Sequence, residues 1–150
     1  MDDIDRKILA ELQRDGRLSL TDLGERIGLS LSPCHRRVRA LEEAGVIADY
    51  RANLNPSAVG LNFSAIVFVT LRVTDRAAVQ AFEDAVPQIP EIIQAQRLFG
   101  DPDFLLHVVT TDLAAYQKLY DYSLSTLPSV QRLTSTLVMR NVVQNRALPI

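Results

Sequence analysis

The sequence contains a single cysteine, Cys34, and only two histidines, His35 and His107. An internal disulfide and a cysteine-based zinc cluster are therefore excluded. No apolar run approaches the roughly 20 residues of a membrane span, and the N-terminus has neither the basic start nor the apolar centre of a signal peptide. We therefore expect a cytoplasmic protein that has no membrane partner.

Motifs of nucleotide binding and covalent catalysis are also lacking. The chain has no phosphate-binding loop, no dinucleotide-binding glycine fingerprint and no nucleophile elbow. His107 lies in an apolar segment without an acid or a second histidine at metal-ligand spacing, which is typical of a core or interface histidine. We therefore predict that the protein is not an enzyme and holds no metal and no cofactor.

Charge says little about the partner as long as it is counted over the whole chain. The net charge of −2 argues against a uniformly basic coat for nucleic acid, and neither half of the chain is basic. Any DNA affinity must come from clustered arginines, multiplied by oligomerisation. The 47% hydrophobic content of the 150 residues is that of a globular protein with a real core.

Such a cluster lies in residues 30–45, which carry three arginines within four positions. Helical spacing separates an apolar stripe from a polar face. The apolar stripe contains Cys34, Val38 and Leu41. The residues for which we predict DNA contact are Ser30, Ser32, Pro33, His35, Arg36, Arg37 and Arg39. Arginine suits this role because its guanidinium group binds guanine edges and phosphates with two parallel hydrogen bonds.

Two members of this set have alternative roles. Arg37 lies nearer the packed flank, where it either contacts phosphate or pairs with an acid. His35 either contacts a base or is a shoulder residue, meaning one that borders the core of the unit without a role in DNA binding. For the whole set, the plain alternative is a solvated helix face with ordinary surface ion pairs.

Two shorter helical patterns precede this segment. Asp2 and Asp5 form an acidic helix start, after which apolar residues repeat at helical spacing. Ser19 with Asp22 opens a second helix, and Gly28 is expected to close it in a left-handed conformation. Two short helices joined by a glycine turn, with a third behind them, describe a helix-turn-helix.

Gly24, in the middle of the second helix, fits this arrangement because a missing side chain lets the third helix pack closely across it. An unspecialised three-helix bundle is the alternative. It would leave the arginine face unexplained, so we favour DNA binding.

After Gly45 the sequence becomes β-type over residues 46–56, which predicts a strand or a wing that leads into a linker. The remaining pattern is strand, helix, two strands around a GDPD turn, helix and final strand, the last extending over residues 130–144. The order βαββαβ is that of a ferredoxin-like split βαβ. We thus predict an α+β chain with a helix-turn-helix domain in 1–52, a linker in 53–61 and a ferredoxin-like domain in 62–150.

The first strand of the second domain has apolar residues on both faces. Ala65, Val67 and Val69 share one face, and Ile66, Phe68 and Leu71 lie largely on the other. Both faces of the sheet therefore have to be buried, and a second sheet from another subunit is the simplest cover. The resulting homodimer would hold two arginine helices at the fixed spacing that a pseudo-palindromic site requires.

Taken together, several segments resemble the leucine-responsive and asparagine-responsive regulators, the Lrp/AsnC family. They are IDRKILAELQRDGRLS, GLSLSPCHRRVRALEEAGVI, YRANLNP, GDPDFLL, AAYQKL and TLPSV, and they cover essentially the whole chain in one register. The resemblance implies a winged helix-turn-helix that binds promoter DNA and a ferredoxin-like domain that mediates assembly and senses amino acids. It also implies dimers that associate into octamers.

The resemblance further implies effector-binding residues in two regions. Those of the GDPD turn are Gly100, Asp101 and Asp103, and those expected to line a pocket between subunits are Leu113, Thr136 and Val138. A tight hairpin turn and plain strand positions are the alternatives. Leu31 and His35 stand where the family more often has proline and leucine, and Phe104 stands where tyrosine is usual, which leaves the effector unnamed.

From these observations we expect a sequence-specific transcriptional regulator that binds double-stranded DNA and is modulated by an amino acid or related metabolite bound between subunits. The first alternative is an architectural protein that bends or wraps DNA with little sequence preference and no ligand. The second is a small-molecule-binding or catalytic ferredoxin-like domain whose helical module no longer binds DNA.

Overall fold

The computed structural model describes all 150 residues, which fall into two compact units that are described separately below. The first unit comprises Met1–Asn53 together with Val142–Ile150, and the second comprises Leu54–Asn141. Residues 142–150 thus lie with the N-terminal unit, whereas we expected them to be part of the C-terminal domain.

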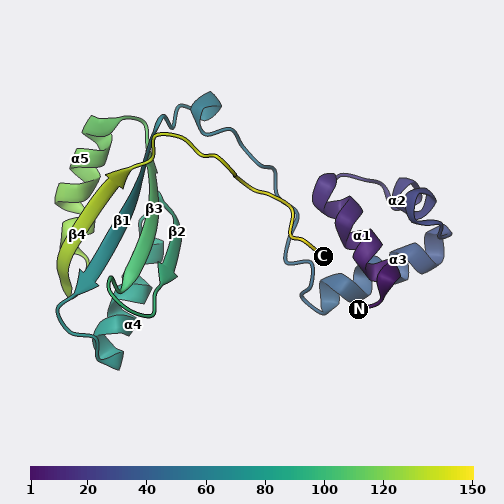
Figure 1. The fold of residues 1–150 in the computed structure, drawn as a ribbon, viewed down its shortest axis with the longest axis horizontal. Helices are drawn as coiled ribbons and strands as arrows, with labels where there is room; N and C mark the ends of the chain where they lie inside the picture. Colours follow the sequence, from purple (N-terminus) through teal and green to yellow (C-terminus); the bar gives the residue numbers. More distant parts are fainter. The chain divides into compact units, whose positions relative to one another are not determined.

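The first unit is built on three helices (Figure 1). They are α1 (Asp3–Arg14), α2 (Leu20–Ile27) and α3 (Leu31–Glu43). Each helix contributes one fully buried side chain to a common core, Ile8 from α1, Leu23 from α2 and Cys34 from α3. Burial of these apolar faces fixes the rotation of each helix about its axis.

The helix ends follow the capping signals of the sequence. At the start of α1 the backbone amide of Asp5 donates to Asp2 Oδ1 at 2.9 Å, and the amide of Asp2 donates to Asp5 Oδ2 at 3.0 Å. This reciprocal pair is a capping box. The Ser19 hydroxyl accepts from the amide of Asp22 at 3.1 Å, and Gly28 ends α2 in the left-handed conformation. The predicted caps of both helices are confirmed.

Gly24 is required by the turn rather than by the third helix. A Cβ atom at this position would lie 2.6 Å from the carbonyl oxygen of Leu29, whereas the Cβ of Cys34 in α3 would be 3.8 Å away, an ordinary contact. The amide of Leu29 also donates to the carbonyl oxygen of Gly24 at 2.8 Å. The backbone after α2 therefore folds directly onto Gly24, which corrects the reason that we expected for this glycine.

The chain after α3 contains no β-strand until residue 63. The only regular element there is the short helix η1 (Ser57–Val59). Of the strand or wing that we expected over residues 46–56, the strand is therefore wrong. A strand needs a partner to satisfy its backbone groups, and the structure provides none beside this segment.

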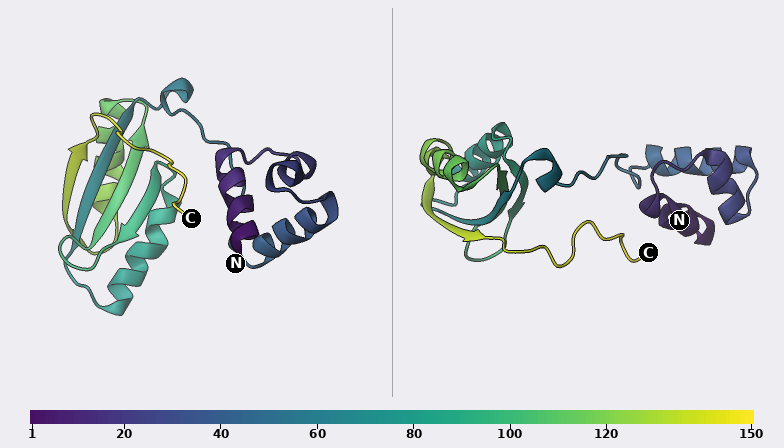
Figure 2. Two further views of the ribbon diagram at one scale, coloured as in Figure 1. Left: turned by 45° about the vertical axis from the view of Figure 1, so that its right-hand side comes forward. Right: turned by 90° about the horizontal axis from the view of Figure 1, so that it is seen from above.

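The second unit is a four-stranded antiparallel sheet with the spatial order β2-β3-β1-β4. Its strands are β1 (Phe63–Leu71), β2 (Ile92–Arg97), β3 (Phe104–Thr110) and β4 (Val130–Leu137). The helices α4 (Arg76–Ala85) and α5 (Leu113–Tyr122) cover one face of this sheet (Figures 1 and 2). The predicted order βαββαβ is confirmed, although β4 ends at Leu137 and not at residue 144.

The core of this unit lies between the sheet and the two helices. Val67 and Leu106 of the sheet and Phe82 of α4 are fully buried there. Leu71, which we expected on the opposite face, is also part of this core at 4% exposure, because it has the same parity along the strand as Val67. The other face carries apolar side chains that remain only partly buried in the single chain.

None of the helices is both long enough and apolar enough to cross a membrane.

Candidate DNA interface and effector-binding residues

The position of α3 is fixed by its buried stripe of Cys34, Val38 and Leu41, each at most 6% exposed. At 100° per residue, this stripe turns Ser32 and Arg36 to the opposite side of the helix, where both are exposed. The predicted division of the helix into a packed face and a polar face is confirmed.

The two arginines of the polar face are available for a ligand. Arg36 makes no hydrogen bond or ion pair. Arg39 Nε contacts Glu43 Oε1 at 3.0 Å, but both side chains are about two-thirds exposed. An exposed pair one helical turn apart stabilises by only about 0.3–0.5 kcal/mol, so Arg39 can leave Glu43 for a stronger anion at little cost.

The N-terminus of α3 adds hydrogen-bond donors to this face. Ser30 is the residue before the helix, but its side chain makes no capping hydrogen bond. Pro33, in the first turn, has no backbone N–H to satisfy. The first-turn amides of Leu31 and Ser32 are therefore free of a side-chain cap, and the positive end of the helix dipole favours an anion there.

Arg37 has a different environment from its neighbours. Its Nη1 atom lies 2.8 Å from Asp5 Oδ1 and 2.9 Å from Asp2 Oδ2, so two carboxylates hold one guanidinium. These hydrogen bonds, first that of Asp5 and then that of Asp2, raise the pKa of Arg37. The pKa of Asp2 is lowered, chiefly by the backbone hydrogen bond from Asp5. Of its two expected roles, this geometry supports pairing with acids.

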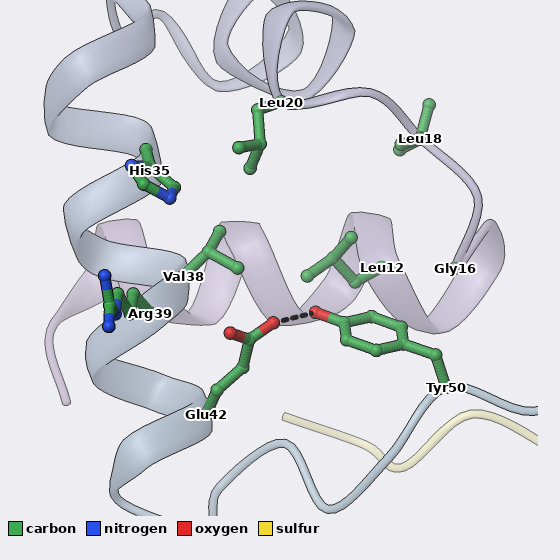
Figure 3. Close-up of a pocket in the computed structure, with 9 residues that line it drawn as sticks. All are labelled: Leu12, Gly16, Leu18, Leu20, His35, Val38, Arg39, Glu42 and Tyr50. Atoms are coloured by element: carbon green, nitrogen blue, oxygen red, sulfur yellow. Dashed lines mark hydrogen bonds between the residues drawn. The ribbon is translucent and has the colours of Figure 1, made fainter.

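A cavity of about 260 Å³ lies beside α3 (Figure 3). Its lining residues are Leu12, Gly16, Leu18, Leu20, His35, Val38, Arg39, Glu42 and Tyr50. His35 is an exposed residue of this lining, which supports its reading as a shoulder beside the core. The Tyr50 hydroxyl donates to Glu42 Oε1 at 3.0 Å. Burial, and then the bond to Glu42, raise the pKa of Tyr50 to about 12.

Tyr50 and Glu42 were not among the predicted site residues. Their hydrogen bond ties the segment that follows α3 back to that helix, so they hold the chain where it leaves the DNA-binding unit. The signal in the sequence was the lone aromatic residue between α3 and β1.

The GDPD turn connects β2 to β3 and is fastened to β1. The backbone amide of Asp103 donates to the carbonyl oxygen of Val69 at 2.9 Å, and Asp103 Oδ2 accepts from the amide of Leu71 at 2.7 Å. Gly100 has φ of 134°, a conformation that L side chains rarely adopt. Asp101 Oδ1 lies 3.9 Å from Arg132 Nη2. One oxygen of Asp103 therefore has a structural role, while Asp101 remains exposed.

The other predicted effector residues lie at the opposite end of the sheet. Thr136 faces Ile66 across the β1–β4 ladder, and the amide of Val138 donates to the carbonyl oxygen of Ser64 at 2.9 Å. Ile66 precedes Leu71 by five residues, or about 16 Å of strand at about 3.3 Å per residue. Leu113 begins α5, directly after the end of β3 on this side. Within one chain the structure therefore does not bring the two groups together.

Two further residues from the sequence analysis have structural partners. Phe104 is 3% exposed, and its ring centroid lies 4.5 Å from that of Phe82, so it faces the core and not the turn. His107 lies on the uncovered face of the sheet, where Nε2 is 2.7 Å from the Ser64 hydroxyl. Burial lowers the pKa of His107. No group of three or more histidine, cysteine or acidic side chains is arranged to hold a metal ion.

Sequence profiles of known families match both units. Residues 1–48 match the winged helix-turn-helix DNA-binding profile, and residues 64–148 match the Lrp/AsnC ligand-binding domain. The chain belongs to the Lrp/AsnC family.

Similar regulators match this Lrp/AsnC chain over nearly its full length. The leucine-responsive regulatory protein of Rhizobium meliloti is 42% identical over 142 residues, which cover 95% of this chain and 91% of that protein. The proline dehydrogenase transcriptional activator of Rhodobacter capsulatus is 39% identical over 147 residues, which cover 98% and 96%.

A solved structure is also similar. The crystal structure of a transcriptional regulator from Neisseria meningitidis, in complex with L-Met, superimposes with a TM-score of 0.94. The two chains are 36% identical, and the match covers 99% of this chain and 96% of that one. This Lrp/AsnC chain therefore has the predicted α+β architecture and is a transcriptional regulator with a DNA-binding unit and a ligand-binding domain.

Proposed function

We propose that this protein reads operator DNA with the polar face of α3. The observation that carries the proposal is the row of Ser32, Arg36 and Arg39, which is held outward by the buried stripe of the same helix. Two guanidinium groups on one face are suited to guanine edges in the major groove or to the adjacent phosphates. The uncapped first turn of α3 adds backbone donors for a further phosphate.

The proposed reader is a homodimer joined through the uncovered face of the sheet. Ile66 and Phe68 lie on that face with Leu105, and all three are only partly buried in the single chain. A second copy of the sheet would remove these side chains from water. Two-fold symmetry then presents two α3 helices to two half-sites, and dimers associate further into octamers.

The proposed effector is an amino acid or a related metabolite, the class to which the L-Met of the Neisseria meningitidis relative belongs. The residues of the GDPD turn and those near Thr136 are separated by about 16 Å of strand, and an amino acid is much shorter than that. A site that uses both groups must therefore combine residues of two chains. For the effector to act, it must bind two states of the assembly with different affinity.

This proposal includes neither catalysis nor a cofactor. The relatives named above are regulators, and the chemistry that the two units offer is recognition of anions and of a small zwitterion. Because the protein acts on DNA, a cytoplasmic location remains part of the proposal.

Fluorescence anisotropy with the DNA upstream of the protein's own gene tests the proposal, in the presence of excess unrelated DNA. We expect tight, competitor-resistant binding by the wild type and a loss of at least tenfold in affinity in Arg36→Ala/Arg39→Ala. The double variant Arg76→Ala/Arg140→Ala removes the same charge from exposed positions of the second unit and should bind as the wild type does.

A pool of the twenty amino acids, added to each sample, tests the effector. We expect it to shift the affinity of the wild type. Equal binding by the wild type and Arg36→Ala/Arg39→Ala would refute α3 as the reader. Binding that unrelated DNA displaces equally well would favour the architectural alternative.

A further inference from the structure

Residues 142–150, here called the tail, lie against α1 of the DNA-binding unit. The side-chain amide of Gln13 pairs with both backbone groups of Leu148. Gln13 Oε1 accepts from the amide of Leu148 at 2.6 Å, and Gln13 Nε2 donates to its carbonyl oxygen at 3.3 Å. The Gln13 side chain thus satisfies both backbone hydrogen-bonding groups of Leu148, as a neighbouring strand would in a sheet.

A second hydrogen bond and an apolar groove also contribute to the binding of the tail. Asn145 Nδ2 donates to Asn53 Oδ1 at 2.8 Å. Beneath Leu148 and Ile150 lies a cavity of about 330 Å³. Its apolar walls from the DNA-binding unit, which we call the tail groove, include Leu9, Leu12, Val46 and Ile47.

The tail is held loosely in this groove. Leu148 remains 70% exposed and Ile150 46% exposed. Few buried contacts therefore offset the conformational entropy that is lost when the tail becomes ordered. A contact of this kind opens and closes readily, as a switch requires.

The tail follows closely, along the chain, on residues that we predict to bind the effector. Thr136 lies near the end of the β1–β4 ladder, where it pairs with Ile66. The hydrogen bond from the amide of Val138 to the carbonyl oxygen of Ser64 follows it. Leu148 follows Val138 by only ten residues. A ligand that contacts Thr136 and Val138 therefore contacts the chain four residues before the tail begins.

We propose that the tail is a reversible second tether, which connects the effector-binding residues of a chain to the DNA-binding unit of the same chain. The first connection is the covalent linker that follows Asn53. The tail adds a non-covalent one, and the effector changes DNA affinity by favouring either its docked or its released state. This inference rests on the proposed function, since it assigns the route by which effector binding reaches the reader.

The variant Gln13→Leu tests the tether because it removes both hydrogen bonds to Leu148 at an exposed position of α1. Gln88→Leu is the matched control, since it makes the same change at an exposed glutamine outside the tail groove. Hydrogen exchange should show an amide of Leu148 that is protected in the wild type and in Gln88→Leu but exchanges at least fivefold faster in Gln13→Leu. Equal exchange in all three would overturn the docked tail.

The functional readout is the shift in operator affinity that the amino-acid pool causes. We expect Gln13→Leu to keep the ligand-free affinity within about twofold and to lose most of the shift, while Gln88→Leu keeps both. An unchanged shift in Gln13→Leu overturns the tether but leaves the proposed function intact. Absence of operator binding in the wild type would instead refute the proposed function.

Crosslinking shows which chain supplies the tail. In the full chain with Val46→Cys and Leu148→Cys, which line the same groove and leave the Gln13 side chain in place, a short bis-maleimide should join the two cysteines within one polypeptide, because Cys34 is buried and does not compete. A crosslinked band at the mass of a single chain supports the tether as proposed. A band at twice that mass, with none within the single chain, would overturn it in favour of a tail supplied by the partner subunit.

Discussion

Replacement of Gly24 by alanine tests whether the turn of the helix-turn-helix depends on close backbone contact. In an ordinary helix this change is stabilising, because alanine is favoured over glycine by about 1 kcal/mol. Here the added Cβ would lie 2.6 Å from the carbonyl oxygen of Leu29, below the 3.0 Å that real Cβ contacts respect. The neighbour is backbone, so it cannot rotate aside as a flexible side chain does.

The expected magnitude follows from these two opposing effects. Overpacking in a well-packed region costs about 1–3 kcal/mol. Because the turn after α2 must move as a unit, we take the upper part of that range and subtract the gain in helix propensity. We therefore expect Gly24→Ala to lower the free energy of unfolding of the DNA-binding unit by about 1–2 kcal/mol, a factor of roughly 5–30 in the folded-to-unfolded ratio.

Native-state hydrogen exchange of the α1 and α2 amides is the suitable assay, since it reports on this unit within the full chain. Gly16→Ala is the control, because its Cβ would meet only ordinary contacts at 3.6 and 3.7 Å. It should change the free energy by no more than about 0.5 kcal/mol. Slower exchange in Gly24→Ala than in the wild type would refute the close-contact argument.

Three further variants have definite expected outcomes. Since burial lowers the pKa of His107, the unfolded chain binds more protons just below pH 6.5, so thermal stability should fall as the pH drops through that window, and less so in His107→Gln. Asp103→Ala should lower the melting temperature by leaving the amide of Leu71 unpaired, at a cost of about 1–3 kcal/mol, whereas Asp103→Asn keeps an acceptor oxygen and should cost less. Phe82→Ala removes a fully buried ring and should cost about 3–5 kcal/mol in urea unfolding of the second unit, unless the core closes around the gap.

Local signals in the sequence predicted most of the fold because they report contacts between residues close in the chain. The capping pairs Asp2–Asp5 and Ser19–Asp22 predicted where two helices begin. The two residues of each pair are only three positions apart in the sequence. Strand parity predicts which side chains of β1 enter the core, and our expectation for Leu71 was wrong because it departed from that parity. These features need no knowledge of the rest of the chain.

The features that were wrong or missed depend on residues far apart in the sequence. Nothing near Gln13 indicates that it will bind the backbone of Leu148, 135 positions later. The β-type composition of residues 46–56 could not reveal that no partner strand lies beside them. For Arg37 we predicted either a phosphate contact or a pair with an acid. The sequence could not show that the acids of the α1 capping box, Asp2 and Asp5, lie beside it.

The pairing of Arg37 with Asp2 and Asp5 also affects how strongly DNA binding depends on salt concentration. Two carboxylates already neutralise this guanidinium, so it releases few counterions when α3 approaches the phosphates. Arg36 and Arg39 then remain as the two cations that each reading helix can offer, and a dimer offers four. Where all four lie on phosphates rather than on guanine edges, the two α3 helices of a dimer should contribute a slope of about −3.6, at about 0.9 per neutralised phosphate, to a plot of log affinity against log salt concentration. Three free arginines per helix would give about −5.4, a difference that such a titration resolves.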